Sequence, residues 1–344
     1  MPKMLRIECS GTPYEIGLQH GQEARVQISR SIMFYADLFL KEAKLDWYQV
    51  QSLAMKFEPV IREKWPAYME EMRGIADGTD LGVEDIIAIN VRTEIAFGAF
   101  SDGCTALSWK TEEHSWLAQN WDWNEVQKKN LVFLSIEQPG KPKIKMITEA
   151  GLIGKIGLND AGVGVCLNAI KAKGMDATRL PCHLGLRMVL ESTSRADAVE
   201  KLEKFGISSA CHMLIADENG GVGVEWSSTD VAKLEMNEAR QVFHANHFLL
   251  QHDGVEDKKW LEDSSFRTSR IEELAEKVEG EPTYEKLYDI FCDEENFPGS
   301  ICRKMEGRSQ SASLFNIVMD LKARRADVTL GRPTEPEEKI ILSF

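Results

Sequence analysis

Long apolar runs are missing from this sequence, and this absence excludes several kinds of protein. No stretch approaches the roughly 20 apolar residues that a membrane-spanning helix needs. The N-terminal sequence MPKMLRIECS has no long apolar segment of the kind that a secretory signal requires. The C-terminal sequence IILSF is not a peroxisomal address of the SKL type. We therefore expect a cytoplasmic protein with no membrane partner.

Basic residues are also in short supply. The chain of 344 residues has 41 lysines and arginines against 55 aspartates and glutamates, a formal net charge of −14. A nucleic-acid partner is not expected, because affinity for phosphate backbones depends on clustered positive charge. Hydrophobic residues make up 43% of the chain and charged residues 28%, which is the balance of a globular protein with a substantial core.

The cysteines form no CxxC pair, and their number is odd. This pattern argues against a zinc ribbon and a disulfide framework, so we expect reduced thiols, most of them buried. The histidines of HANHFLLQH (244–252) are not spaced as in HExxH, and no metal site is expected there. The cysteines are Cys9, Cys104, Cys166, Cys182, Cys211, Cys292 and Cys302.

Helical and strand-like patterns divide the chain near residue 104. Apolar residues recur three and four positions apart before it, which predicts helices, whereas alternation and β-forming residues after it predict strands. The order has little regular alternation of strand and helix, which favours an α+β fold with two packed antiparallel sheets covered by helices. The predicted helices are 25–43, 48–78 (ending at Gly78), 83–97, 183–205, 266–280 and 284–291. The predicted strands are 105–110, 116–123, 131–138, 143–150, two around the turn 159–162, a hairpin within 212–228, 311–333 and 339–344.

The segment DGCTA carries the most informative chemistry. Cys104 follows Gly103 at the junction of the helical and strand-rich parts. Glycine leaves its own carbonyl sterically open, so the thiol of the next residue can attack it. The acyl group then shifts from nitrogen to sulfur, and water cuts the ester. This chemistry predicts autoproteolysis between Gly103 and Cys104, with Cys104 as a new N-terminus.

An N-terminal cysteine carries its own base. The α-amine has a reference pKa of about 8 and the thiol one of about 8.5, so the amine can accept the thiol proton without a separate histidine. Taken alone, the tripeptide Gly-Cys-Thr is a weak motif, since most such tripeptides are structural.

Polar residues further along the chain supply the other functions of an acyl-transfer site. Such a site needs donors aimed at the tetrahedral oxyanion, and groups that orient the amine and hold a charged substrate. Asn246 suits the first function, and Asp122 and Arg303 suit the others. Asn120 and Ser309 lie in the same segments. Structural interpretations stay open for each: a turn aspartate, a buried amide or a surface ion pair.

A set of segments carries a chain-long resemblance. They run in order from near residue 10 to near residue 335: GTPYEIGLQHG, MEEMRGIADG, NVRTEIAFG, DGCTA, QNWDW, KMITEAGLIGKIGLNDAGVGVCLNA, LRMVLEST, HANHFLLQH, SICRKMEG, SASLFNIVMD and LGRPTEP. In these segments the chain resembles the isopenicillin N acyltransferase family of penicillin biosynthesis, a family of self-processing cysteine Ntn-hydrolases.

The resemblance implies one four-layer αββα Ntn-hydrolase domain, cleaved into an α subunit (1–103) and a β subunit (104–344) that stay together as a heterodimer. It implies Cys104 as the thioester-forming nucleophile, Asn246 in the oxyanion hole and Asp122 near the acceptor amine. It also implies acyl-CoA as co-substrate and no bound cofactor. The supporting or substrate-binding residues expected from the matching segments are Thr105, Asn120, Trp123, Ser227, Arg303, Ser309 and Gln310.

The chain departs from the family pattern at three points. Gln310 follows Ser309 where the family enzyme has an arginine expected to hold the carboxylate of the penicillin nucleus, and glutamine offers no charged fork. After Asp122, Trp123 and Asn124 replace a pair of aromatic residues, which changes the expected pocket for the acyl chain. The third departure is the missing peroxisomal address. The native substrate is therefore expected to differ from that of the penicillin enzyme.

Three functions stand as hypotheses. The leading one is an autoproteolytically activated acyltransferase or amidohydrolase that exchanges or removes the acyl side chain of isopenicillin N or 6-aminopenicillanic acid with acyl-CoA. The second is an amidohydrolase of small peptides or N-acyl amino acids with little acyl-CoA activity, which Gln310 favours. The third is an unprocessed, non-catalytic binding protein.

Overall fold

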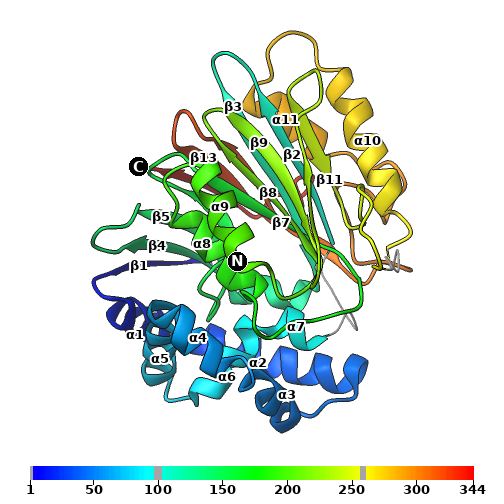
Figure 1. The fold of residues 1–344 in the computed structure, drawn as a ribbon. Helices are drawn as coiled ribbons and strands as arrows, with labels where there is room; N and C mark the ends of the chain where they lie inside the picture. The colour runs from blue at the N-terminus through cyan, green and yellow to red at the C-terminus, as the bar shows by residue number, and fades with distance from the viewer. Residues whose placement is uncertain (1–2, 97–102, 256–260) are drawn as a thin grey trace.

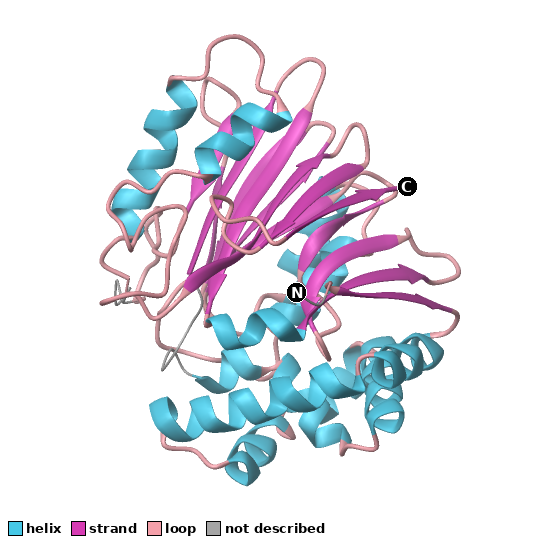
Figure 2. Ribbon diagram, turned by 180° about the vertical axis from the view of Figure 1, so that it is seen from behind, coloured by secondary structure: helices cyan, strands magenta, loops and turns pink. Residues whose placement is uncertain are grey.

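The computed structural model describes residues 3–96, 103–255 and 261–344. Two β-sheets lie face to face with helices on their outer sides, and a group of helices from the first hundred residues covers one end (Figures 1 and 2). The expected α+β sandwich of two sheets between helices is confirmed. The single helix predicted over 83–97 is two helices, Val83–Asn90 and Arg92–Ala96, and residue 97 lies outside the described residues.

The larger sheet has eight strands in the order β1-β4-β5-β6-β7-β8-β9-β10. Its neighbours are antiparallel except β1 and β4, which run parallel with Leu5 opposite Val132. The expectation of purely antiparallel sheets is wrong for this pair, because the long chain between β1 and β4 provides the crossover that parallel pairing needs. The strands are β1 (Leu5–Ser10), β4 (Leu131–Glu137), β5 (Ile144–Glu149), β6 (Ile156–Asn159), β7 (Gly164–Ala169), β8 (Cys211–Asp217), β9 (Gly220–Trp226) and β10 (Val231–Leu234).

The smaller sheet has six strands, all antiparallel, in the order β11-β2-β3-β12-β13-β14. Its strands β2 and β3 contact β7, β8 and β9 of the larger sheet, so the core lies between the sheets. Every residue of β3 and β12 is buried, because both faces of this sheet are covered. The strands are β2 (Gly103–Lys110), β3 (Ser115–Trp123), β11 (Gln241–His244), β12 (Ala312–Asp320), β13 (Arg325–Leu330) and β14 (Glu338–Ser343).

Four helices cover the outer faces of the sheets. α8 (Cys182–Leu190) and α9 (Arg195–Phe205) pack against β6, β7 and β8 of the larger sheet. α10 (Ser264–Glu276) packs on β2 and β11, and α11 (Tyr284–Phe291) packs on β3 and β12. The single helix predicted over 183–205 is two helices, and the Ser194 side chain caps the second by accepting from the Asp197 N–H at 3.1 Å.

The helices before Cys104 gather at the blue and cyan end of the molecule in Figure 1. The helix predicted over 48–78 is three helices, because Pro59 and Pro66 start new helices at their first turns. The elements are α1 (Pro13–Glu23), α2 (Arg25–Leu38), the π-helix η1 (Phe39–Ala43), α3 (Trp47–Ala54), α4 (Glu58–Lys64), α5 (Pro66–Thr79), α6 (Val83–Asn90), α7 (Arg92–Ala96) and, after β3, the 3₁₀-helix η2 (Glu125–Asn130).

Gly78 does not end its helix as the sequence predicted. α5 continues to Thr79, and Asp80 follows in the left-handed conformation with φ 57°. Gly78 has a packing role instead, because a Cβ on it would lie 2.5 Å from the carbonyl oxygen of Leu18 on α1. A Cβ on Gly17 of α1 would likewise lie 1.9 Å from the carbonyl oxygen of Glu71 on α5. These glycines let α1 and α5 approach closely.

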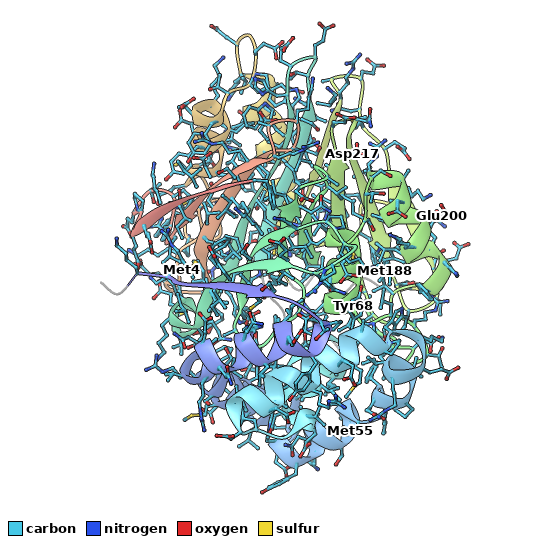
Figure 3. All side chains as sticks on the ribbon, turned by 90° about the vertical axis from the view of Figure 1, so that its left-hand side faces the viewer. Met4, Met55, Tyr68, Met188, Glu200 and Asp217 are labelled. Carbon is cyan, nitrogen blue, oxygen red and sulfur yellow. The ribbon has the colours of Figure 1, made fainter. Side chains whose placement is uncertain are left out.

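Buried polar contacts join the helical end to the sheets. Arg187 of α8 pairs with Glu71 of α5 at 2.8 Å, and Tyr68 donates to Glu191 at 3.2 Å. Arg92 of α7 pairs with Glu149 of β5 at 2.6 Å. Figure 3 views this boundary, with Tyr68 and Met188 labelled on its two sides. These contacts link the parts of the chain before and after residue 104.

Candidate active site

Cys104 is the second residue of β2 and is fully buried. It lies directly opposite Trp121 of β3, so both side chains point to the inner face between the sheets. Thr105 and Asp122 alternate with them and face the outer helices. The thiol therefore lies on one side of the sheet, while the groups around its backbone lie on the other.

The backbone of Cys104 is held at both ends by polar side chains. Its N–H donates to Oδ1 of Asn246 at 2.9 Å, and its carbonyl accepts from Nη1 of Arg267 at 2.6 Å. Asn246 lies two residues beyond the end of β11. Its own N–H donates to Ser264 Oγ at 2.6 Å, and its Nδ2 donates to the Ala169 carbonyl at 3.0 Å. Asn246 is thus held on both sides of its amide while it contacts the Cys104 backbone.

Arg267 is a site residue that the sequence analysis missed. Its fully buried guanidinium donates to the Cys104 carbonyl, to Thr105 Oγ1 at 2.9 Å and to Asn246 Oδ1 at 2.8 Å. The buried residues of α10 recur at helical spacing, and Arg267 is the charged member of that stripe: Ser264, Arg267, Thr268, Ile271 and Ala275. A charged residue on an otherwise buried helix face was the available signal.

Asp122 lies against Gly103, the residue before Cys104. It pairs with Gly103 across β2 and β3, and a Cβ on Gly103 would lie only 3.2 Å from Asp122 Oδ2. Ser313 Oγ donates to Oδ1 at 2.6 Å. Burial raises the pKa of Asp122 from 3.8 to about 6, although Arg303 and Arg267 act in the opposite direction. A carboxyl group that titrates near neutral pH can exchange a proton during a reaction.

Arg303 connects Asp122 to the rest of the site. Its Nε lies 3.6 Å from Asp122 Oδ2, and its Nη1 donates to Ser309 Oγ at 3.1 Å. Its Nη2 pairs with Asp263, which also accepts from Arg267 Nε at 2.9 Å. The described contacts therefore form a continuous chain from Asp122 through two arginines to Cys104. Asp263, like Arg267, was not predicted from the sequence.

Asn120 has a structural role. Its Nδ2 donates to the carbonyls of Phe291 and Ile301 at 2.9 and 3.0 Å, and its Oδ1 accepts from Asn316 at 2.9 Å. Ile301 is two residues before Arg303, so Asn120 fixes the segment that carries this arginine. The expected supporting role is indirect, because these bonds engage both ends of the Asn120 amide.

Three further predicted residues lie at the margin of this network or away from it. Trp123 is buried and packs edge-on against Phe34 of α2, with ring centroids 6.2 Å apart. Gln310 is exposed beside Ser309. Ser227 accepts from the Asp230 N–H at 2.8 Å, and every hydrogen bond that the described residues give it stays within this turn. Ser227 thus has the geometry of a turn residue.

Asn124, the substitution in the expected acyl pocket, has a local explanation. It precedes η2, and its Oδ1 accepts from the Val126 N–H at 3.1 Å. An asparagine at this position caps the helix, which an aromatic residue could not do.

Among the residues that the structure describes, no group of three or more histidines, cysteines, aspartates or glutamates is arranged to hold a metal ion. His244 bonds Glu225 at 2.8 Å, and His247 bonds Ser264 at 2.7 Å. Within the described part of the chain, every helix is too short or too polar to cross a membrane.

Comparisons with solved structures give distant likenesses. A mutant of the conjugated bile acid hydrolase from Clostridium perfringens is 12% identical, with a TM-score of 0.48 over 70% of this chain and 92% of that chain. Penicillin V acylase from Agrobacterium tumefaciens is 13% identical, with a TM-score of 0.46 over 70% of this chain and 86% of that chain.

Comparisons of sequence are much closer. The family model described as acyl-coenzyme A:6-aminopenicillanic acid acyl-transferase matches residues 109–335. The Emericella nidulans protein named acyl-coenzyme A:6-aminopenicillanic-acid-acyltransferase 40 kDa form is 40% identical over 99% of this chain and 96% of its own length. The expectation of an enzyme that transfers or hydrolyses acyl groups is confirmed, and the chain belongs to the acyl-coenzyme A:6-aminopenicillanic acid acyl-transferase family.

Proposed function

We propose that this protein cleaves itself between Gly103 and Cys104 and then uses Cys104 to accept an acyl group as a thioester. The observation that carries the proposal is the pair of contacts on the Cys104 backbone, its N–H on Asn246 and its carbonyl on Arg267. Both backbone atoms belong to Cys104 before and after cleavage. The same side chains can therefore hold the precursor and the mature N-terminus.

Self-cleavage begins with attack of the Cys104 sulfur on the carbonyl carbon of Gly103. A carbon–sulfur bond forms, the Gly103–Cys104 amide bond breaks, and the Cys104 nitrogen takes up a proton. Water then hydrolyses the thioester and releases the Gly103 carboxylate. Asp122 supports this step, because it lies against Gly103 and its raised pKa of about 6 suits it to exchange protons.

The freed α-amine is the base for the mature enzyme. Asn246 Oδ1 accepts from it, and Arg267 donates to the same oxygen at 2.8 Å. Oδ2 of Asp122 is buried without a hydrogen bond from the described residues, so it can accept from the amine as well. The reference pKa of such an amine is about 8, so its neutral form is available near neutral pH and can take the thiol proton.

Acyl transfer then follows in two balanced steps. The Cys104 sulfur attacks the donor carbonyl, and the tetrahedral oxyanion accepts from Nδ2 of Asn246 before the donor's thiol or amine leaves. An acceptor amine, or water, next attacks the thioester and releases the acyl group. We assign acyl-CoA as acyl donor and 6-aminopenicillanic acid as acceptor, following the name of the Emericella nidulans relative. The sequence resemblance to isopenicillin N acyltransferases adds the amide side chain of isopenicillin N as a second donor. No bound cofactor takes part.

A narrower amidohydrolase is the second candidate. Gln310 is exposed, uncharged and adjacent to Ser309, which Arg303 binds. A neutral amide there weakens charge-assisted capture of a carboxylate-bearing acceptor, and water then competes more effectively for the thioester. An unprocessed binding protein is the remaining alternative, with neither cleavage nor a thioester.

The fragments before and after the cut should remain together as a heterodimer. Ion pairs between Arg92 and Glu149 and between Arg187 and Glu71 cross the cleavage boundary in buried surroundings. Separating the fragments would expose these charges and the shared core, at a large cost in free energy. We assign the heterodimer to the cytoplasm.

Purified protein and its Cys104→Ala variant provide the test. The wild type should give two bands on a denaturing gel, the larger starting at Cys104, while the variant stays one chain. Incubation with an acyl-CoA should add the acyl mass to the larger fragment, and added 6-aminopenicillanic acid should remove it as an amide. An uncut wild type without a thioester would refute the proposal, and release of free acid alone would favour the amidohydrolase.

A further inference from the structure

A buried polar cluster lies beside the segment that carries Asn246. We call it the Glu225 cluster, after the carboxylate at its centre on β9. His244 Nε2 bonds Glu225 Oε1 at 2.8 Å, and His252 Nε2 bonds Oε2 at 3.0 Å. The side chains of Glu225 and His244 are fully buried, and that of His252 is nearly so. The other members of the cluster are His212, Asn168 and Asp230.

Glu225 also binds the backbone of the same segment. The Leu249 N–H donates to Oε1 at 2.7 Å, and the Leu250 N–H donates to Oε2 at 3.1 Å. Together with His244 and His252, these groups give the carboxylate four donors, all from residues 244–252. Asn246 lies inside this segment, so Glu225 closes it into a loop on both sides of Asn246.

His244 lies between two oxygen atoms. Its Nδ1 faces the Ala245 carbonyl at 2.9 Å, and its Nε2 faces Glu225 Oε1 at 2.8 Å. Burial alone raises the pKa of Glu225, but the hydrogen bond and charge of His244, with the bonds from Leu249 and His252, lower it overall. The carboxylate therefore carries its charge in the fold, compensated by several donors.

A second layer holds His244 in place. The ring of His212 stacks on that of His244 with centroids 3.5 Å apart and planes 8° from parallel. Asn168 joins the two, because its Oδ1 faces His212 Nδ1 at 3.0 Å and its Nδ2 donates to the His244 carbonyl at 3.3 Å. Burial, with the neighbouring His244, lowers the pKa of His212 well below its usual value, so this ring is neutral. His244, two residues before Asn246, is thus fixed through its ring and its carbonyl.

We propose that Glu225 is a positioning residue, which acts through the 244–252 loop to aim the Asn246 amide at the oxyanion. This proposal rests on the proposed function, in which Asn246 stabilises the tetrahedral intermediate. Glu225 belongs to β9 of the larger sheet, whereas Cys104 belongs to β2 of the smaller one. The cluster therefore fixes the oxyanion donor relative to both sheets without contacting the substrate.

Glu225→Gln tests the proposal with little change in volume. The glutamine oxygen can accept from two of the four donors, but its NH₂ group then faces the other two, and the loop must shift. Two reagents separate the consequences in processed protein. Acylation of Cys104 by 4-nitrophenyl acetate forms an oxyanion, whereas alkylation by iodoacetamide does not. Both products are measured by mass on the peptide that begins with Cys104.

Acylation should fall by about 10-fold to 100-fold, as expected when a donor is misplaced by up to about 1 Å rather than removed, while the rate of alkylation stays unchanged. Glu71→Gln is the matched control, because Glu71 is also a buried carboxylate. It pairs with Arg187, and both residues are far in sequence from the 244–252 loop. This control should leave the ratio of acylation to alkylation as in the wild type.

His252→Ala covers the case in which Glu225→Gln does not fold. It removes one donor of the four, so it should lower acylation by a smaller factor in the same direction. An unchanged ratio in these variants, or an equal fall in both reactions, would overturn the positioning role. Failure of the wild type itself to acylate would instead count against the proposed function.

Discussion

Replacing Arg267 with methionine should damage both folding and processing. The guanidinium donates to four oxygens, those of Cys104, Thr105, Asn246 and Asp263, at 2.6–2.9 Å. Methionine keeps much of the length but none of the donors. Asp263 would then have Arg303 as its remaining described cationic partner, and Asn246 would lose one of the two described donors to its Oδ1.

The size of the effect follows from the burial of these groups. Each hydrogen bond from a charged group contributes about 1.5–3 kcal/mol to the free energy of unfolding. The four values cannot simply be added, because bonds within one network are coupled. Breaking a buried ion pair by removing one partner costs about 3–5 kcal/mol, and this is the loss in unfolding free energy that we expect. Misplacing Asn246 should in addition slow acylation by up to about 10²–10³-fold.

The assay separates stability from chemistry by using two backgrounds. In Cys104→Ala protein, which should stay uncut, urea denaturation compares Arg267→Met with its parent as equal single chains. In Cys104 protein, the fraction cleaved over time measures processing. Arg270→Met is the control, because Arg270 lies on the same helix but pairs with Asp293 at 2.7 Å, away from Cys104. An Arg267→Met protein with parental stability and a wild-type cleavage rate would refute this reasoning.

Further predictions concern pH, the fragment interface, helix packing and specificity. The pKa of Asp122 is about 6 in the folded state, against 3.8 for the ordinary carboxyl group. The folded state therefore keeps the proton longer, and the free energy of unfolding should fall as pH rises between these two values. Asp122→Asn, introduced into Cys104→Ala protein, should remove this pH-dependent fall from thermal melts. Arg187→Met leaves Glu71 buried without its cation and should cost about 3–5 kcal/mol, measured as easier separation of the fragments in urea. Gly78→Ala forces a contact at 2.5 Å and should cost about 1–3 kcal/mol in urea denaturation. Gln310→Arg should raise amide formation relative to free-acid release with a carboxylate-bearing acceptor, and an unchanged product ratio would count against a role for this position.

Local signals in the sequence predicted the hairpins and most helices. The turn at 159–162 joins β6 and β7, and a second turn joins β8 and β9, because glycine-rich turns between β-forming runs specify hairpins within a few residues. The strand β1 was missed for a different reason. It pairs in parallel with a strand more than a hundred residues away, so its neighbours in the sequence give no sign of its partner.

The interruptions of the helical segment also have a physical explanation. Apolar residues recur at helical spacing throughout 48–78, so this pattern predicted one helix and did not indicate the new helices that begin near Pro59 and Pro66. Gly78 was interpreted as a helix end because glycine is common there. Its actual requirement is the closeness of α1, a tertiary contact that the sequence of α5 alone does not contain.

The site shows the same division. The proposed nucleophile could be assigned from the motif around Cys104 alone, because the proposed cleavage chemistry involves adjacent residues. Arg267 could be connected to Cys104 and Asn246 only after folding, since 163 and 21 positions separate it from them. Asn120 and Ser227 occur in matching segments, yet their side chains bind a neighbouring loop and a turn. A shared segment therefore indicates a shared fold more securely than it assigns each residue a chemical role.

The charge balance of the site bears on the proposed self-cleavage. Asp122 and Asp263 offset Arg267 and Arg303 in a buried network, so the intact chain carries no large uncompensated charge there when both carboxyl groups are ionised. The proposed cleavage would add an amine at Cys104 and a carboxylate at Gly103 to the same place. Because the pKa of Asp122 is about 6, its carboxyl group can give up or take a proton near neutral pH and keep the balance as these groups form. Burial raises the pKa of Asp122, and the same carboxyl group would thus exchange protons first during cleavage and afterwards with the N-terminal amine.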